Sequence, residues 1–448
     1  MRKAVSLVLA GVMAFSLVGC SSSNDKKDGK EVTTTLPAEV QKDLEDQKVT
    51  LKVVTTYAGN DSNAQIYQDA YKAWEAKSGN TVEDGSVTAD ESFKEKVITD
   101  FQVGEEPDVL FYFNGKDSDA FVSQGKVMSI DEIRAEYPDY AKNMKDDMMG
   151  ASPVDGKNYS VPVNGYWEAM FVNKNVLKAA GVDVPDATTT WTDFIDICQK
   201  IKDAGYSPIA ASLAHIPHYW FEYSIYNHTS PATHNAVPAK ADDDQGKAWA
   251  AGLDDIKALY EKGFFPDNTL TATDDETFQL FATDKAAFLI DGNWKIGDIT
   301  KSVEDIANVT VTYVPGSVAD RKTTDMIGGI SMGYYITKKA WDDPAKRKAA
   351  VDFVSHMTSD EVVSQFAGVS ATALVNGATV DESTLNSLQI DAVALCKGAT
   401  GISPAVQDNL SEAARVPIFG NMAAIVKGEK TSADAVKEVL DIIADETK

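Results

Sequence analysis

The spacing of hydrophobic residues predicts that strands and helices alternate where the folded part of the chain begins. A β-branched run at 49–56 is typical of a strand. Beyond it, Ile66, Ala70 and Trp74 recur every four residues and predict one face of a helix. Gly79 is the kind of residue that ends a helix, so we expect the helix to stop there.

A second helix and another strand follow in the same order. Phe93, Val97 and Phe101 mark the next helical face. Residues 108–113, directly after Pro107, form an apolar run typical of a buried strand. Strands that alternate with helices favour a parallel sheet with crossover connections.

The alternation returns in the second half of the chain. Short strands are expected at 208–211 and 286–290, and the tail from Pro344 onward is predicted to be mostly helical. The residues that define helical faces there are Trp191, Phe194, Ile195, Cys198 and Ile201, then Ala350, Phe353, Val354 and Met357. The whole pattern predicts an α/β fold.

The first twenty residues have a different pattern. Arg2 and Lys3 precede an apolar stretch that ends at Val18 and is too short to span a bilayer, which predicts a secretory signal peptide. The stretch closes with small residues before Cys20 and resembles a bacterial lipobox, where that cysteine carries a diacylglyceryl group. Two acyl chains, palmitate among them, are enough for stable anchoring. The alternative is a secreted protein with a chance cysteine.

A polar tether is expected after Cys20. Residues 21–30 contain no apolar side chain, so they cannot bury enough surface to offset the entropy of ordering. The polar run continues to about Lys48. Roughly 400 residues remain, which is more than one compact domain usually holds, so we expect two lobes.

Charge and cysteine content restrict the function classes. The formal net charge of −26 disfavours nucleic acid and anionic lipid as partners of the folded body. Cys198 lies in an apolar helical pattern and is expected to be a buried free thiol, although a disulfide with Cys396 stays open. The sequence has no CxxC pair, which argues against a zinc site made of thiolates, and no cofactor is predicted.

Several segments share one order and spacing with a known family. The first is Gly104–Val109. The second is a long run from Tyr166 to Ile209 that includes Lys174, Gly181 and Trp191. The others are Phe281–Phe288 with Gly292–Trp294, then Gly328–Gly329, and finally Ala435–Leu440. Together they resemble the extracellular solute-binding proteins (family 1) of ABC carbohydrate importers, the group that includes maltose-binding protein. One departure is Asp284, which stands where the family usually has glycine.

The resemblance implies a two-lobe, periplasmic-binding-protein-like fold (class II) with parallel-type sheets, flanking helices and crossing hinge strands. The expected crossings lie near Val161–Gly165 and Gly328–Gly333. The expected parts are a signal peptide at 1–19, a linker at 20–48, a first lobe at 49–163 and 329–375, a second lobe at 164–328, and a helical part at 376–448 that packs on the second lobe.

Candidate ligand-binding residues follow the expected strands and crossings, where the loops of an α/β sheet converge. Aromatic rings stack on a pyranose, and amides and carboxylates bond its hydroxyls. The candidates are Tyr57, Asn60 and Asp61; Tyr112, Phe113 and Asn114; Tyr166, Trp167, Glu168 and Gly329; and Asp291 with Trp294. Trp294 matches a stacking tryptophan of the family. Core packing is an equal alternative for Phe113 and Trp167, and Gly329 is also suited to close backbone approach.

The segment 215–228 is rich in aromatic residues and histidines. One hypothesis is a sugar subsite in which Tyr219 and Trp220 stack, while His215 or Glu222 bonds hydroxyls. A second is plain core packing. A third is a transition-metal site, because closely spaced imidazoles are good ligands. The sequence leaves the three open.

The function implied is that of a substrate-binding lipoprotein, held on the extracellular face of the cell membrane by Cys20. It would pass an oligosaccharide to a heterodimeric ABC permease with a cytoplasmic ATPase. We expect a monomer, no enzyme and a Gram-positive host. The alternatives are a secreted glycoside hydrolase, which would use two carboxylates, and a binding protein for a polyol, a glycerol phosphate or a metal. No Ser-His-Asp, HExxH or phosphate-loop signature supports catalysis.

Overall fold

The first predicted strand, helix and strand form one edge of a four-stranded sheet. The computed structural model describes residues 47–446 except 60, 90, 146–148, 215–217, 317–320 and 371–377, so Cys20 and most of the expected linker lie outside the described residues. The sheet has the order β2-β1-β3-β9. Its strands are β1 (Thr50–Val54), β2 (Thr81–Asp84), β3 (Val109–Phe113) and β9 (Met332–Ile336). The first three are parallel, as predicted, while β9 is antiparallel to β3.

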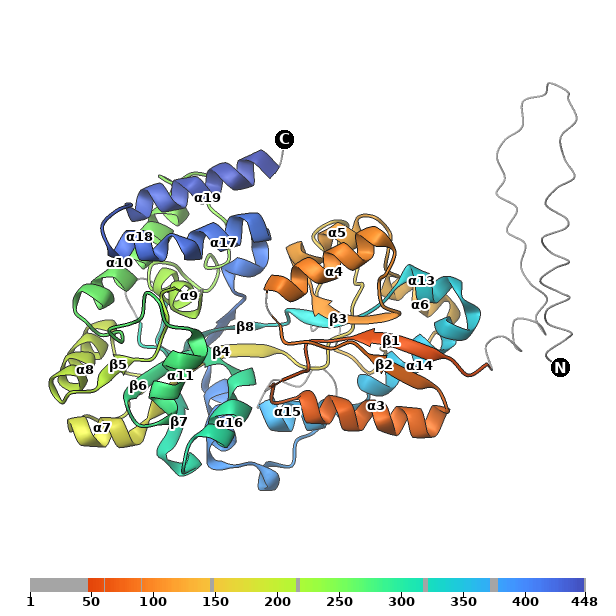
Figure 1. Cartoon of the computed structure of the whole chain (residues 1–448), viewed down its shortest axis with the longest axis horizontal. Coiled ribbons are helices and arrows are strands. Elements are labelled where there is room, and N and C mark those ends of the chain that lie inside the picture. Colours follow the sequence, from red (N-terminus) through yellow and green to blue (C-terminus); the bar gives the residue numbers. More distant parts are fainter. Residues whose placement is uncertain are drawn as a thin grey trace, which may run out of the picture. The chain divides into compact units, whose positions relative to one another are not determined.

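Helices cover both faces of this first sheet (Figure 1). They are α3 (Ala64–Ser78), α4 (Glu91–Val103), α5 (Asp119–Val122), α6 (Ile130–Glu136), α13 (Lys338–Asp342), α14 (Pro344–Met357) and α15 (Asp360–Ser370), with the short turn η2 (Gly115–Ser118). The predicted end of α3 is confirmed, since Gly79 has φ +71° and its N–H donates to the Glu75 carbonyl. On one face of the sheet Trp74 packs edge-on against Phe353. On the other, Phe101 stacks on Phe121.

A second sheet has the order β10-β8-β4-β6-β5, with β7 also paired to β4. Its strands are β4 (Tyr166–Asn173), β5 (Ser207–Ile209), β6 (Ala286–Gly292), β7 (Val309–Thr312), β8 (Asp325–Gly329) and β10 (Gly401–Ser403). Two pairs are parallel, β5 with β6 and β10 with β8. Because β4 enters directly from the first lobe, it runs antiparallel to all three neighbours. The second sheet is therefore mixed, where parallel-type sheets were expected.

Ten helices of the described chain surround the second sheet. They are α7 (Lys174–Ala180), α8 (Trp191–Asp203), α9 (His218–Tyr226), α10 (Asp244–Glu261), α11 (Asp274–Ala282), α12 (Ile296–Ser302), α16 (Ser387–Gly398), α17 (Glu412–Gly420), α18 (Met422–Val426) and α19 (Ser432–Glu446). The predicted buried free thiol of Cys198 is confirmed, and no disulfide joins it to Cys396. Among the described helices none is long and apolar enough to cross a membrane.

The two sheets are joined where the sequence placed the crossings. Val161 bridges to Tyr334 beside the first sheet, and five residues later Tyr166 pairs with Gly329 in the second. Backbones approach closely here: a Cβ on Gly328 would lie 2.7 Å from the Tyr166 carbonyl oxygen. Glycine is therefore required at that position of the hinge. A third passage lies farther on, since Ala378 packs in the core of the first sheet and Leu388 in that of the second.

Asp284 shows how the chain accommodates its departure from the family pattern. It has φ +58°, the left-handed region that glycine adopts without strain. Its carboxylate compensates by accepting hydrogen bonds from the Asn173 and Asn175 side-chain amides at 2.7 and 3.0 Å. The turn before β6 is thus tied to the end of β4 by this substitution.

Candidate ligand-binding site

Three predicted stacking residues lie together, each contributed by a different element of the second lobe. Tyr166 begins β4, Tyr219 lies in α9, and Trp294 lies in the short turn η4 (Asn293–Lys295) directly after β6. The Trp294 ring centroid is 6.5 Å from that of Tyr166 and 5.9 Å from that of Tyr219. All three side chains are half-buried. We call this group the aromatic trio.

The position of Trp294 depends on the glycine two residues before it. A Cβ on Gly292 would lie 2.2 Å from the Cη2 atom of the Trp294 ring, so the ring occupies the space that any side chain would need. The turn is fixed from the other side by Asn293, whose Oδ1 accepts a hydrogen bond from the Trp167 backbone N–H at 3.1 Å. Sequence reasoning quoted Gly292 as part of a motif but assigned it no role.

Three carboxylates lie near the aromatic trio. Glu168 follows Tyr166 by two residues on the same face of β4. Asp291 on β6 pairs with the next residue, Ala169, and so leaves the sheet on the other face, but it accepts a hydrogen bond from the Trp294 side chain. The third is Asp408, in the turn η7 (Val406–Asn409), which accepts a hydrogen bond from the Tyr166 hydroxyl at 3.3 Å. We call Glu168, Asp291 and Asp408 the acidic trio.

Burial dominates the electrostatics of the acidic trio. It raises the pKa of Glu168 well above the ordinary value, and the charges of Glu222, Asp408 and Asp291 raise it further. Burial raises the pKa of Asp408 to about 7, again with help from Glu222. The pKa of Asp291 rises to about 6 by burial, although Lys295 and a hydrogen bond from the Trp294 side chain oppose the shift. The three groups therefore resist ionising together.

Glu222 supports the site from behind. Its Oε2 accepts hydrogen bonds from His234 Nε2 at 2.8 Å and from the Val406 N–H at 2.9 Å, and its Oε1 accepts from the Gln407 N–H at 3.1 Å. The side chain is fully buried. Both oxygens thus hold the turn that carries Asp408, which gives Glu222 a structural role distinct from the hydroxyl contact predicted for it.

The first lobe contacts this site through the loop after β1. Ser62, which sequence reasoning missed, donates from Oγ to the Trp294 carbonyl at 2.6 Å and accepts from the Gly297 N–H at 2.9 Å. Its neighbour Asp61 is half-buried, and its Oδ1 accepts a hydrogen bond from the Asn63 N–H. Burial raises the pKa of Asp61 to about 6, against the hydrogen bonds from Asn63. The predicted Asp61 thus directly precedes the residue that contacts the Trp294 backbone.

The remaining first-lobe candidates lie apart from the aromatic trio. Tyr57 is buried among Tyr67, Phe111 and Phe366, and Tyr112 is fully buried between Phe93 and Phe121. Phe113 is half-buried, with Lys94 Nζ 4.2 Å from its ring centroid.

The side-chain oxygen of Asn114 is hydrogen-bonded, whereas its side-chain nitrogen is not. Its Oδ1 accepts hydrogen bonds from the Tyr335 and Ser160 hydroxyls at 2.6 and 2.7 Å. Its Nδ2 is buried without a partner, beside a small pocket lined by Gly150, Ser152 and Tyr159 among others. This amide is the one first-lobe candidate of the described chain that combines an open donor with a pocket.

In the second lobe, Trp167 and Trp220 are packed in hydrophobic cores with 4% and 2% exposure. Gly329 pairs with Tyr166 in the hinge. Asn60 and His215 lie outside the described residues. His228 of the segment pairs with Asp255, and His234, six residues beyond it, pairs with Glu222. No metal-binding cluster occurs in the described chain.

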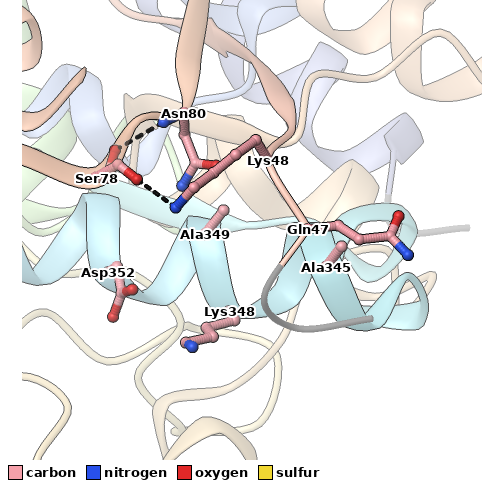
Figure 2. A pocket seen from close by; sticks show the side chains of 8 residues that line it. All are labelled: Gln47, Lys48, Ser78, Asn80, Ala345, Lys348, Ala349 and Asp352. Atoms are coloured by element: carbon pink, nitrogen blue, oxygen red, sulfur yellow. Dashed lines mark hydrogen bonds between the residues drawn. The ribbon is translucent and has the colours of Figure 1, made fainter. Parts of the chain in front are cut away.

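A second pocket lies on the far side of the first lobe (Figure 2). Its lining comes from the segment before β1, the end of α3 and the start of α14: Gln47, Lys48, Ser78, Asn80, Ala345, Lys348, Ala349 and Asp352. Lys48 Nζ crosses it to donate to the Ser78 carbonyl at 2.6 Å. None of the predicted site residues lies there.

Three solved structures with the same fold are described as binding proteins or receptors. The chain superposes on a chitin oligosaccharide binding protein with a TM-score of 0.77 and 19% identity, covering 89% of this chain and 98% of that one. For the GacH receptor of Streptomyces glaucescens, solved without ligand and with acarbose, the TM-score is 0.71 at 19% identity, with coverage of 89% and 98%. For Lmo0181 of Listeria monocytogenes, in complex with cycloalternan, it is 0.71 at 16%, with coverage of 90% and 99%.

Sequence relatives are more distant. The sn-glycerol-3-phosphate-binding periplasmic protein UgpB of Rhizobium meliloti is 20% identical over 294 residues, 64% of this chain and 66% of that protein. Its Brucella abortus counterpart is 24% identical over 215 residues, 46% and 48% of the two chains. The chain thus matches from about half to two thirds of these relatives. The family model of bacterial extracellular solute-binding proteins matches residues 57–364, which is more than half of the chain, and the chain belongs to that family.

Proposed function

We propose that this protein captures an oligosaccharide between its lobes and delivers it to the permease of an ABC importer. The observation that carries the proposal is the aromatic trio: Tyr166, Tyr219 and Trp294 come from three elements and meet where Ser62 of the first lobe contacts the Trp294 backbone. Aromatic faces stack on sugar rings, and the neighbouring carboxylates accept hydrogen bonds from hydroxyls.

The names of the solved relatives favour the same ligand class. Receptors for chitin oligosaccharide, acarbose and cycloalternan share the fold of this chain over nearly its whole described length. The curated relatives bind glycerol phosphate by name. A phosphate would enter a site where Glu168, Asp291 and Asp408 gather, and like charges repel, so the site disfavours that class.

The proposal includes a cellular setting. Cys20 would anchor the protein to the extracellular face of a Gram-positive membrane, next to a heterodimeric permease whose cytoplasmic ATPase supplies the work. A tether of this kind raises the local concentration of the receptor at its permease. The receptor would act as a monomer, and its carboxylates would bind hydroxyls without cleaving a glycosidic bond.

The test is a thermal-shift screen of the full mature chain against a panel of neutral oligosaccharides, followed by titration calorimetry. A ligand that binds only the native state must raise the melting temperature. Chromatography of the sugars after incubation separates binding from hydrolysis. Stabilisation with intact sugar supports the proposal. Shortened products would establish a hydrolase instead, and a panel without any stabilising sugar would refute oligosaccharide capture.

A further inference from the structure

One oxygen of the Glu168 side chain is buried without a hydrogen-bond partner. The residue is 1% exposed, and its Oε2 has no hydrogen-bond partner in the described part of the chain. Neither protonation state is satisfied there, because a buried carboxylate oxygen lacks a donor and a buried carboxyl O–H lacks an acceptor. A buried polar atom without a partner lowers the stability of the fold, so we expect a bound ligand to supply the missing hydrogen bond.

The adjacent Glu222 shows that the fold can satisfy a buried carboxylate at this place. Glu222 is equally buried, yet His234 and two backbone N–H groups donate to its oxygens. Glu168 receives nothing comparable at Oε2, although it is close enough to Glu222 to be affected by its charge. Glu222 is therefore a structural carboxylate, whereas Glu168, near the aromatic trio, keeps an oxygen available for a ligand.

The charges around Glu168 indicate the sign of the missing partner. Glu222, Asp408 and Asp291 all act on it with negative charge. The lysines that act on the acidic trio are already engaged: Lys295 pairs with Asp298 at 3.0 Å, and Lys94 pairs with Asp117 at 3.0 Å. A neutral sugar hydroxyl could bond one oxygen but would leave the mutual repulsion of the carboxylates in place.

A cation would interact favourably with both the acidic trio and the aromatic trio. It would neutralise carboxylates that resist ionising together, and its approach to the faces of Trp294, Tyr166 and Tyr219 is favourable because aromatic rings attract cations. An organic cation can make both contacts at once, because its carbon skeleton can lie against the rings while its charge meets the carboxylates.

Resting on the proposed function, we propose that the ligand of this site is an amino sugar, with its protonated amine directed at Glu168 and its ring against the aromatic trio. Glu168 is then the residue that selects for the amine. Asp408 and Asp291 supply the surrounding negative charge, and Tyr166 holds Asp408 in place through its hydroxyl.

The test compares ligands that differ at one substituent. The mono- to trisaccharides of β-1,4-linked glucosamine, N-acetylglucosamine and glucose carry an amine, an acetamide or a hydroxyl at the same carbon. Wild type should bind the glucosamine forms at least about tenfold more tightly than the glucose forms. In Glu168→Gln, which keeps shape and removes charge, that ratio should fall to near one. The exposed Glu429→Gln makes the same charge change elsewhere and should leave the ratio intact.

Each outcome decides. A melting temperature of unliganded Glu168→Gln close to or above that of wild type shows that the variant folds, since it replaces a buried carboxyl group whose Oε2 has no partner. If no glucosamine form stabilises wild type, or if the ratio is unchanged in Glu168→Gln, the amino-sugar inference is overturned. If neutral sugars bind and glucosamine forms do not, only this inference fails. If no sugar of any kind binds, the proposed function fails as well.

Discussion

Arg415 of the second lobe donates from Nη2 to Glu91 Oε2 of the first lobe at 2.8 Å, and the same guanidinium lies 3.3 Å from Asp117 Oδ1. Arg415 is 3% exposed, and burial alone would raise the pKa of Glu91. The hydrogen bond from Arg415 and the charge of Lys94 outweigh burial and hold that pKa below its ordinary value. The pair joins α17 to α4, so it exists only while the lobes are together.

Arg415→Gln should therefore weaken ligand binding without touching the ligand. Loss of a desolvated interlobe ion pair lowers the population of the closed form, and we expect an affinity loss of roughly tenfold. Titration calorimetry measures the affinity, and small-angle scattering should show a larger radius of gyration for the variant. Arg347→Gln is the matched control, because Arg347 pairs with Glu136 inside the first lobe at 2.8 Å. Equal losses in both variants would contradict a closing role for Arg415.

Gly297→Ala should obstruct closure at the opposite contact. A Cβ on Gly297 would lie 2.6 Å from Ser62 Oγ and 2.9 Å from its Cα, so the lobes could not approach as they do here. Alanine suits helix α12, and the fold itself should be unharmed. We expect at least about a tenfold loss of affinity at an unchanged melting temperature of the unliganded protein. Gly420→Ala, which meets nothing within 4 Å, is the control. Wild-type affinity in Gly297→Ala would show that ligand binds with the lobes farther apart.

Trp294→Ala should cost at least about tenfold in affinity, because it removes the ring common to both contacts of the aromatic trio. Gly292→Ala should have a similar effect by a different route, since its methyl group would displace the Trp294 ring. Trp191→Ala removes a half-buried tryptophan at the start of α8, outside the site, and should bind normally. Titration calorimetry on the three variants tests whether the ligand binds at Trp294. Unaffected binding in Trp294→Ala would move the site away from η4.

The sequence was sufficient for the elements whose hydrophobic period reflects one buried face, such as α3 and α8. The crossings were located by the family resemblance, and glycine is needed there for the close approach of Gly328 to Tyr166. It was insufficient for β3, whose faces are both covered by helices: Phe111 packs on one side and Tyr112 on the other. Both residues look alike in a continuous apolar run, so Tyr112 could not be distinguished from a cleft residue.

Two residues of the site, Asp408 and Ser62, could not be predicted from the sequence, for a different reason. Tyr166, Tyr219 and Trp294 sit at strand ends or in a conspicuous aromatic segment, which a single sequence can indicate. Asp408 reaches Tyr166 from 242 positions away along the chain, and Ser62 reaches Trp294 from 232. Nothing local distinguishes these two from other surface residues, because their roles arise only when the lobes and the C-terminal segment pack together.

The acidic trio should give the unliganded protein an inverted pH dependence. The pKa of Asp408 is about 7 and that of Asp291 about 6 in the folded chain, above the values of an unfolded chain. The folded state therefore binds more protons between about pH 4 and about pH 7, and these groups contribute stability that is lost as pH rises through that window. The charged and polar groups that act on Asp408 are Glu222, Lys94, Asp117 and Tyr166, and Asp408 in turn acts on Glu168.

Asp408→Asn isolates this contribution. It keeps an acceptor for the Tyr166 hydroxyl and removes a carboxyl that is reluctant to ionise, so the variant should melt at a higher temperature than wild type near pH 8 and at a similar temperature near pH 5. Melting curves across that range measure the difference. Binding of glucosamine oligosaccharides by wild type should strengthen between about pH 4 and about pH 6, because Asp291 and Asp408 begin to gain negative charge there while the sugar amine is still protonated. A parallel shift of Asp408→Asn and wild type at every pH would place the titration on other groups.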